Sequence, residues 1–317
     1  MKIARILLFV LVIGGLGFAV VNQQNIRDWY ALRNYDPPEQ IAKLADDTGM
    51  SDYGRRLFYI SQPELNDQSS FNDNCQFPER TIVLGCYAAQ RIYIYDVNND
   101  QVDGIEEVTA AHEMLHAAYE RLSTRERDRI NDLLEQTFLE LNDQRLNETI
   151  AEYEDADPSS VPNELHSILA TEHRDLPAEL EKHYSQFFND RQKVVEISEA
   201  YEKVFEDLEA KIEKYDKQLE DLKLQITNLE FALETQSRNI ENESNRLDSL
   251  LNNNQIAAYN AAVPSYNLQV NEYNSQIDDY QTLVDRHNDI VEKRNDIALE
   301  QNELVQSLDS KFMPIGN

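Results

Sequence analysis

The chain contains few of the residues that interrupt secondary structure or form disulfide bonds. Among its 317 residues are only 8 glycines, 9 prolines, 2 cysteines and 1 tryptophan. Most of the glycines and prolines lie in the first 180 residues, which leaves the last third free to form long uninterrupted helices. The two cysteines, Cys75 and Cys86, have no close cysteine neighbours, and this argues against the closely spaced cysteine pairs of structural zinc sites.

Positive charge is also scarce. Lysine and arginine number 29 against 59 aspartates and glutamates, so the formal net charge is −30. A field of this sign repels phosphate backbones and anionic lipid headgroups. Nucleic acid is therefore not an expected partner, whereas a content of 41% hydrophobic residues is enough for a folded core.

The start of the chain contains a long hydrophobic run. Residues 6–21 are uncharged, and Lys2 and Arg5 precede them. This pattern predicts a transmembrane anchor at residues 1–22 of a single-pass cell-membrane protein, with a cytoplasmic N-terminus and the bulk of the chain extracytoplasmic. A cleaved signal peptide is the alternative. Residues 23–38 are expected to form a juxtamembrane linker.

The cysteines belong to a segment of predicted strands. Residues 81–87 and 91–95 are rich in β-branched and aromatic side chains, and residues 88–90 can form the turn between them. In an oxidising compartment Cys75 and Cys86 are expected to form one disulfide bond. Two buried free thiols are the alternative.

From about residue 196 onward the chain has the pattern of a coiled coil. Apolar residues recur at alternating spacings of three and four in two stretches, separated by three consecutive asparagines and Pro264. We expect an antiparallel hairpin whose arms, at about 50 residues each, reach roughly 75 Å. A parallel dimer of one long helix is the alternative, against which Pro264 argues. The two predicted seams are Phe205, Leu208, Ile212, Tyr215, Leu219, Leu222, Ile226, Leu229, Leu233, and Tyr266, Val270, Tyr273, Ile277, Tyr280, Val284, His287, Val291.

One motif carries recognisable chemistry. His112, Glu113 and His116 form an HExxH sequence inside a predicted helix with small alanines on either side. Residues four apart project from the same helix face, so both imidazoles can bind one metal ion, while Glu113 can take a proton from metal-bound water. The alternative is a pair of surface histidines that bind no metal.

A catalytic zinc ion needs a third protein ligand. Tyr119 and Leu122 occupy the places of the glycine and histidine in the longer HExxHxxGxxH pattern, so a downstream carboxylate is expected instead. The segment Asn163-Glu164-Leu165-His166-Ser167 resembles the NExxS segment of thermolysin-like zinc peptidases. The chain is therefore similar to the gluzincins, which combine HExxH with a downstream glutamate.

This resemblance implies a set of roles. His112, His116 and Glu164 would bind one Zn²⁺, and Glu113 would be the general base. Glu172, two turns further along the same predicted helix, is the alternative third ligand. The chain departs from the gluzincin pattern at Ile168, which replaces the aspartate that would orient a ligand histidine. Candidates for an oxyanion donor are Tyr119, His173, His183 and Tyr184, although a packing role is the favoured interpretation of each.

The expected fold is α+β and mainly helical. A small zincin-like catalytic domain with a short β-hairpin covers residues 39–195, and the coiled-coil hairpin covers residues 196–312. The expected function is a membrane-anchored extracytoplasmic zinc metallopeptidase that acts on a peptide or protein substrate, with a possible protein partner on the coiled coil. The alternatives are a non-enzymatic surface scaffold acting through its coiled coil, and an amide hydrolase that acts on cell wall by the same metal chemistry.

Overall fold

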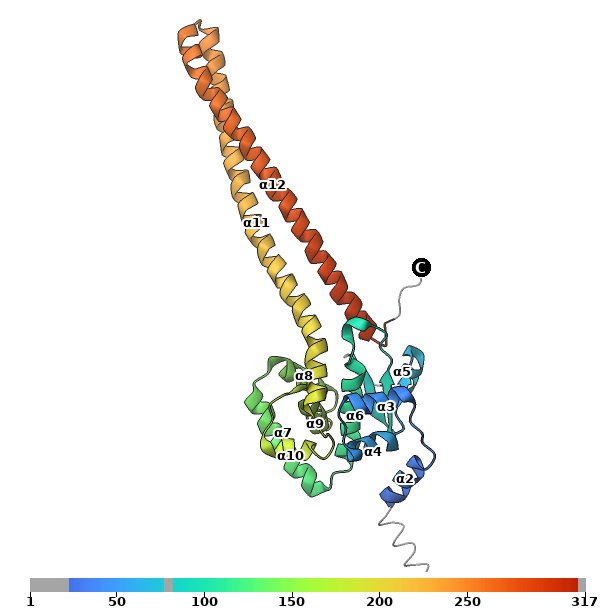
Figure 1. Ribbon diagram of the computed structural model, residues 1–317. Helices are drawn as coiled ribbons and strands as arrows, with labels where there is room; N and C mark the ends of the chain where they lie inside the picture. Colours follow the sequence, from blue (N-terminus) through green and yellow to red (C-terminus); the bar gives the residue numbers. More distant parts are fainter. Residues whose placement is uncertain (1–22, 77–81, 313–317) are drawn as a thin grey trace, which may run out of the picture. The chain divides into compact units, whose positions relative to one another are not determined.

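The computed structural model describes residues 23–76 and 82–312, and these form two compact units. The globular unit takes in the described residues up to Val204 together with the segment from Leu304 onward, and the second unit is Phe205–Glu303. The fold is mainly helical, with one three-stranded sheet (Figure 1). The helices of the globular unit are α2 (Gln23–Leu32), α3 (Glu39–Asp47), α4 (Asp52–Ile60), α5 (Gln68–Asn74), a 3-10 turn η1 (Asp100–Val102), α6 (Ile105–Glu120), α7 (Thr124–Leu141), α8 (Gln144–Ala156), α9 (Val161–Glu172) and α10 (Ala178–Tyr184).

The sheet contains the predicted hairpin and one further strand. Strands β2 (Gly85–Ala88) and β3 (Arg91–Tyr95) pair antiparallel, which confirms the hairpin. The third strand, β1 (Glu64–Asn66), pairs parallel with β3, so the order is β1-β3-β2. β2 therefore lies at an edge of the sheet within the described part of the chain. β1 has only three residues and no apolar alternation, which is why the sequence did not predict it.

Helix α6 is the centre of the globular unit. It packs against α3, α4, α9 and the sheet, and it is buried on nearly every side. Its small residues Ala110, Ala111, Ala117 and Ala118 are at most 2% exposed. Because these side chains are short, neighbouring helices and strands can pack close to the axis of α6. Side chains of these neighbours therefore lie beside the HExxH residues.

The predicted disulfide is present. Cys75, the C-cap of α5, is bonded to Cys86 in β2. Both sulfurs lie in a small apolar cluster with Phe71. The bond ties α5 to the edge strand of the sheet, and that strand lies beside α6.

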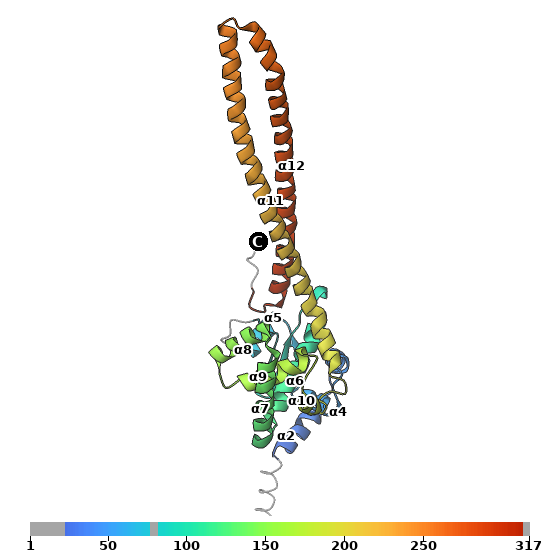
Figure 2. The ribbon, with the colours of Figure 1, turned by 90° about the vertical axis from the view of Figure 1, so that its left-hand side faces the viewer.

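The second unit is an antiparallel pair of long helices, as predicted. Helix α11 (Gln192–Asn252) and helix α12 (Ile256–Leu308) lie side by side and are joined by a tight turn (Figures 1 and 2). Tyr280 donates a hydrogen bond to Glu230 across the pair at 2.8 Å, and Arg294 donates to Asp216 at 3.0 Å. All residues of the first predicted seam are buried or half-buried.

Two details of the predicted hairpin are wrong. Pro264 does not interrupt the helix but lies inside α12; the chain reverses between Asn252 and Ile256. The second seam departs from the prediction at one position, because Ile277 is 42% exposed while its neighbour Gln276 is half-buried; the other seven residues of that seam are half-buried.

The end of α12 belongs to the globular unit. Ser310 is buried; its carbonyl accepts hydrogen bonds from Gln68 at 2.8 Å and from Asn72 at 2.6 Å, and its hydroxyl donates to Asn72 at 3.0 Å. Leu304 and Leu308 are also buried. The globular unit is thus built from two separate stretches of chain rather than from the single stretch 39–195.

The prediction of a single-pass membrane protein is not retained. No helix among the described residues is both long and apolar enough to cross a bilayer. The expected anchor, residues 1–22, lies outside the described residues. The first described helix, α2, falls where a juxtamembrane linker was expected; it has 10 residues, or about 15 Å at 1.5 Å per residue, and carries Arg27 and Asp28.

Candidate metal centre

Helix α6 presents His112 and His116 to the same side. Their ring centroids are 4.7 Å apart, and with Glu113 they form the only cluster of three or more potential metal-binding side chains within the described ranges. Candidate ligand atoms of the three residues all lie within 4.8 Å of one another. The i, i+4 spacing therefore produces the expected convergence of the two imidazoles.

Glu164, the predicted third ligand, lies beside the two histidines. It lies in the first turn of α9, the helix that packs most extensively on α6, and Pro162 stands at the start of that helix. Its Oε2 atom is 3.4 Å from His112 Nε2 and 3.6 Å from His116 Nε2. The positive end of the α9 dipole further favours a charged carboxylate there.

These separations fit a zinc ion. Donor atoms bound tetrahedrally at 2.0–2.1 Å lie about 3.3 Å from one another. The two measured distances from Glu164 exceed this by only a few tenths of an ångström, and all three donors are nitrogen or carboxylate oxygen, the types that catalytic zinc sites use. The distances from Glu164 to His112 and His116 are therefore compatible with zinc ligands.

The pKa values of the Glu164 and Glu113 carboxyl groups are shifted in opposite directions. Although burial raises the pKa of Glu164, the nearby His116 and His112 lower it more, so this pKa lies below the ordinary value. Burial raises the pKa of Glu113 to about 7, and nearby Glu164 adds to the rise while His116 opposes it. One carboxylate is thus held charged beside the histidines, and the other is poised to exchange a proton near neutral pH.

Glu113 has an unusual environment. It is 4% exposed, and its Oε2 atom has no hydrogen-bond partner within the described residues. Gly85 of β2 approaches it so closely that a Cβ atom there would come within 2.7 Å of Glu113 Oε1. Only glycine lets the edge strand lie this close to α6.

The alternative third ligand, Glu172, is engaged elsewhere. Its carboxylate accepts a hydrogen bond from Arg145 Nη2 at 2.8 Å, and the same guanidinium pairs with Glu202. Burial raises the pKa of Glu172, which Arg145 partly offsets. Glu172 is also absent from the cavity that contains the HExxH residues, so the structure brings Glu164 and not Glu172 to the histidines.

A cavity of about 150 Å³ opens onto these side chains. Besides the four candidate site residues it is lined by Val83, Gly85, Cys86 and Tyr87 from the sheet side and by Tyr153 and Asn163 from the helical side. Sequence reasoning missed Tyr153, in α8, whose hydroxyl hydrogen-bonds Glu164 and helps to lower its pKa. The 16 tyrosines of the chain gave no signal that would have singled it out.

The four residues considered as oxyanion donors do not line this cavity. Tyr184 is buried and donates to the His166 carbonyl at 2.9 Å, and Tyr119 donates to Asn131 at 2.8 Å. His183 Nε2 lies 2.9 Å from His166 Nε2, and burial lowers the pKa of His183 to about 4. Burial also lowers the pKa of His173. Tyr119, His183 and Tyr184 are packing residues in the described fold, and His173 is the C-cap of α9.

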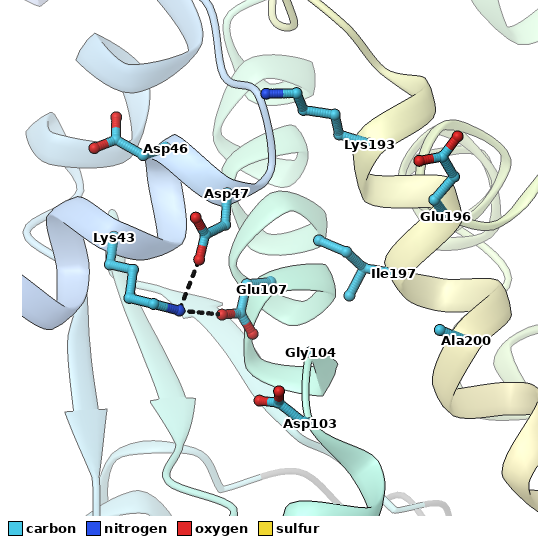
Figure 3. A pocket seen from close by; sticks show the side chains of 10 residues that line it. All are labelled: Lys43, Asp46, Asp47, Asp103, Gly104, Glu107, Lys193, Glu196, Ile197 and Ala200. Carbon is cyan, nitrogen blue, oxygen red and sulfur yellow. Dashed lines mark hydrogen bonds and ion pairs between the residues drawn. The ribbon is translucent and has the colours of Figure 1, made fainter.

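A larger cavity of about 540 Å³ has a different character. It is lined by α3, the start of α6 and the start of α11, and Figure 3 shows carboxylates of Asp46, Asp47 and Glu107 around it. Lys43 pairs with Asp47 at 2.7 Å and with Glu107 at 3.3 Å (Figure 3). Carboxylates outnumber lysines around this cavity, so it is acidic on balance, and no metal-binding cluster is found there among the residues that the structure describes.

Comparison with known proteins gave no relative. No protein-family model, no curated protein and no solved structure matches this chain. The function therefore has to be argued from the site itself.

Proposed function

We propose that this chain is a zinc-dependent peptidase whose metal ligands are His112, His116 and Glu164. The observation that carries the proposal is that one carboxylate oxygen from α9 lies 3.4 Å and 3.6 Å from two histidine nitrogens of α6, within a few tenths of an ångström of the spacing of tetrahedral zinc ligands. A buried carboxylate with an unpaired oxygen, Glu113, lies beside them in the same cavity. The zincin-like character of the globular unit is part of this proposal.

In this proposal each residue of the site has a separate role. A bound zinc ion would act as a Lewis acid on the substrate carbonyl and lower the pKa of a water molecule. Glu113, with a pKa of about 7, takes a proton from the attacking water and passes it to the leaving nitrogen. Glu164 stays charged and holds the ligand geometry, while the low exposure of Glu113 keeps bulk water away from the transferred proton.

The edge strand favours an extended peptide as the substrate. Within the described ranges β2 pairs on one side only, with β3, and four of the cavity residues come from β2 and the residue two before it. Unpaired backbone groups of an edge strand are ready to bind an added strand. β3, by contrast, is the central strand and pairs on both sides. Asn163 Oδ1 is a further buried acceptor without a partner within the described ranges, and a substrate N–H group can satisfy it.

Zinc content and hydrolysis test the proposal together. The full chain, the Glu113→Gln variant and the His116→Ala variant are loaded with zinc, dialysed and assayed for metal by mass spectrometry and for cleavage of an unfolded protein such as casein. We expect about one zinc ion per chain in the parent and in Glu113→Gln, and none in His116→Ala. Because the general base is removed, Glu113→Gln should lose about 10²–10⁴-fold in cleavage rate.

The full chain is needed because residues 304–312 belong to the globular unit. Circular dichroism and thermal melting of each variant separate loss of metal from loss of fold. A parent chain that takes up no zinc, or a Glu113→Gln variant that cleaves as fast as the parent, would contradict the peptidase proposal. The first result would leave a non-enzymatic scaffold that acts through its helical hairpin.

A further inference from the structure

The ligand His116 has a buried neighbour on its far side. Ser167 Oγ lies 3.3 Å from His116 Nδ1, while His116 Nε2 is the nitrogen that faces Glu164. Ser167 is fully buried in the middle of α9, one helical turn after Glu164. The same helix therefore supplies one ligand and touches the back of another.

The direction of this hydrogen bond decides whether His116 can bind a metal. A neutral imidazole carries its proton on one nitrogen only. If Ser167 donates to Nδ1, the proton sits on Nε2 and blocks the nitrogen that faces the site. If Nδ1–H donates to Ser167 Oγ, the lone pair of Nε2 is free for the metal. Zinc binding therefore requires Ser167 to be the acceptor.

We propose that Ser167 is the positioning residue of the metal centre, and this rests on the proposed zinc site. Metal-binding histidines commonly donate their second N–H to a carboxylate, carbonyl or water that fixes the tautomer and the ring orientation. In this chain the position where the gluzincin pattern has such an aspartate is Ile168, which is 4% exposed and packs in the core. The serine hydroxyl one residue earlier takes that role for His116.

A neutral acceptor changes the charge of the centre. Two neutral histidines, one glutamate and a divalent ion sum to +1, and a serine behind His116 leaves this sum unchanged. An aspartate there would reduce it to zero. The serine thus gives the developing oxyanion of a substrate a more positive environment, while it makes His116 a weaker ligand than a carboxylate partner would.

A pair of variants in α9 tests the assignment. Ser167→Ala removes the hydroxyl behind His116. Thr171→Val is the matched control, because Thr171 is equally buried one turn further along and its hydroxyl donates to the Ser167 carbonyl at 2.9 Å. Zinc affinity of the full chain is measured by competition with a fluorescent chelator. We expect Ser167→Ala to bind zinc about 10–100-fold more weakly and Thr171→Val to bind within threefold of the parent.

Nitrogen NMR of zinc-free protein provides a second readout. In the parent, His116 should carry its proton on Nδ1, and Ser167→Ala should lose this preference while its melting temperature matches that of Thr171→Val. Equal zinc affinity in parent and Ser167→Ala overturns the assignment, as does a parent His116 protonated on Nε2. A parent that binds no zinc overturns the proposed function instead, and the NMR result still decides which tautomer Ser167 selects.

Discussion

The surroundings of Glu113 are poorly suited to stability. Its charged form is disfavoured by burial, and its Oε2 atom has no hydrogen-bond partner within the described residues. A buried polar atom left in this state costs about 1–3 kcal/mol. Such groups are concentrated at functional sites, where a shifted pKa is part of the chemistry. The same residue is the one that the peptidase proposal uses as the general base.

Glu106, a half-buried carboxylate outside the metal centre, tests how burial of a charge affects the pH dependence of stability. Burial raises the pKa of this carboxyl to about 7, although its Oε1 atom accepts a hydrogen bond from the Val97 backbone at 2.9 Å. The folded state therefore binds a proton more tightly than the unfolded state, and stability falls as pH rises from about 4.5 to 7. We expect Glu106→Gln to be more stable than the parent by about 1 kcal/mol at pH 8, after allowance for solvent screening, and no more stable at pH 4.

Urea unfolding at both pH values measures this difference. Glu140→Gln, a change at an exposed carboxylate of α7, is the control and should show no comparable pH-dependent gain. A Glu106→Gln variant whose advantage is the same at pH 4 and pH 8 would show that the gain does not come from ionisation.

At the scale of single elements, Pro264 is the clearest local conflict between sequence and structure. It lies inside α12 and is exposed, with neither a turn nor a helix start to accommodate it. A proline in a helix interior lacks the amide donor and is about 3 kcal/mol less favourable than alanine. We expect Pro264→Ala to stabilise the hairpin by about 2–3 kcal/mol, measured by helical circular dichroism during denaturant unfolding. Ala261→Pro, one turn earlier on the same helix, should destabilise it by a similar amount.

The elements that the sequence predicts well are those with a long or a repeated pattern. The HExxH helix, the β2–β3 hairpin and the two long arms all carry such a pattern, and the structure contains each of them. Strand β1 and helix α5 are short and polar, so no periodicity marks them. The strand order could not be predicted either, because β1 pairs with β3 through residues that are 29 positions apart in the sequence, such as Glu64 and Tyr93.

The candidate site follows the same division. His112, Glu113 and His116 could be named from one turn of helix. The choice between Glu164 and Glu172 could not, since both lie on α9 and the distances to the histidines and the position of Arg145 depend on the folded chain. Tyr153 comes from a separate helix, α8, and its contribution depends on tertiary packing alone.

The whole molecule carries a net charge of −30, and this should make its stability depend on ionic strength. Like charges destabilise a compact state, and salt screens them over a Debye length of about 10 Å at 0.1 M. We expect the melting temperature to rise by about 2–4 °C between 10 mM and 200 mM sodium chloride, in calorimetry at pH 7, and to change little beyond. A rise that continues linearly to 1 M would indicate a general salt effect on apolar burial rather than screening.

The buried contact of Ser310 with Asn72 also sets an order of events during synthesis. Asn72 and Ser310 are separated by 238 positions in the sequence, and both arms of the hairpin lie between them. A ribosome releases α5 and the proposed zinc ligands long before the segment that contacts α5 is made, so until then the nascent globular unit lacks Leu304, Leu308 and Ser310. Formation of the hairpin returns the segment with Leu304, Leu308 and Ser310 to the globular unit. If the two arms cannot pair, the globular unit should therefore fold slowly, even though every proposed zinc ligand has already been synthesised.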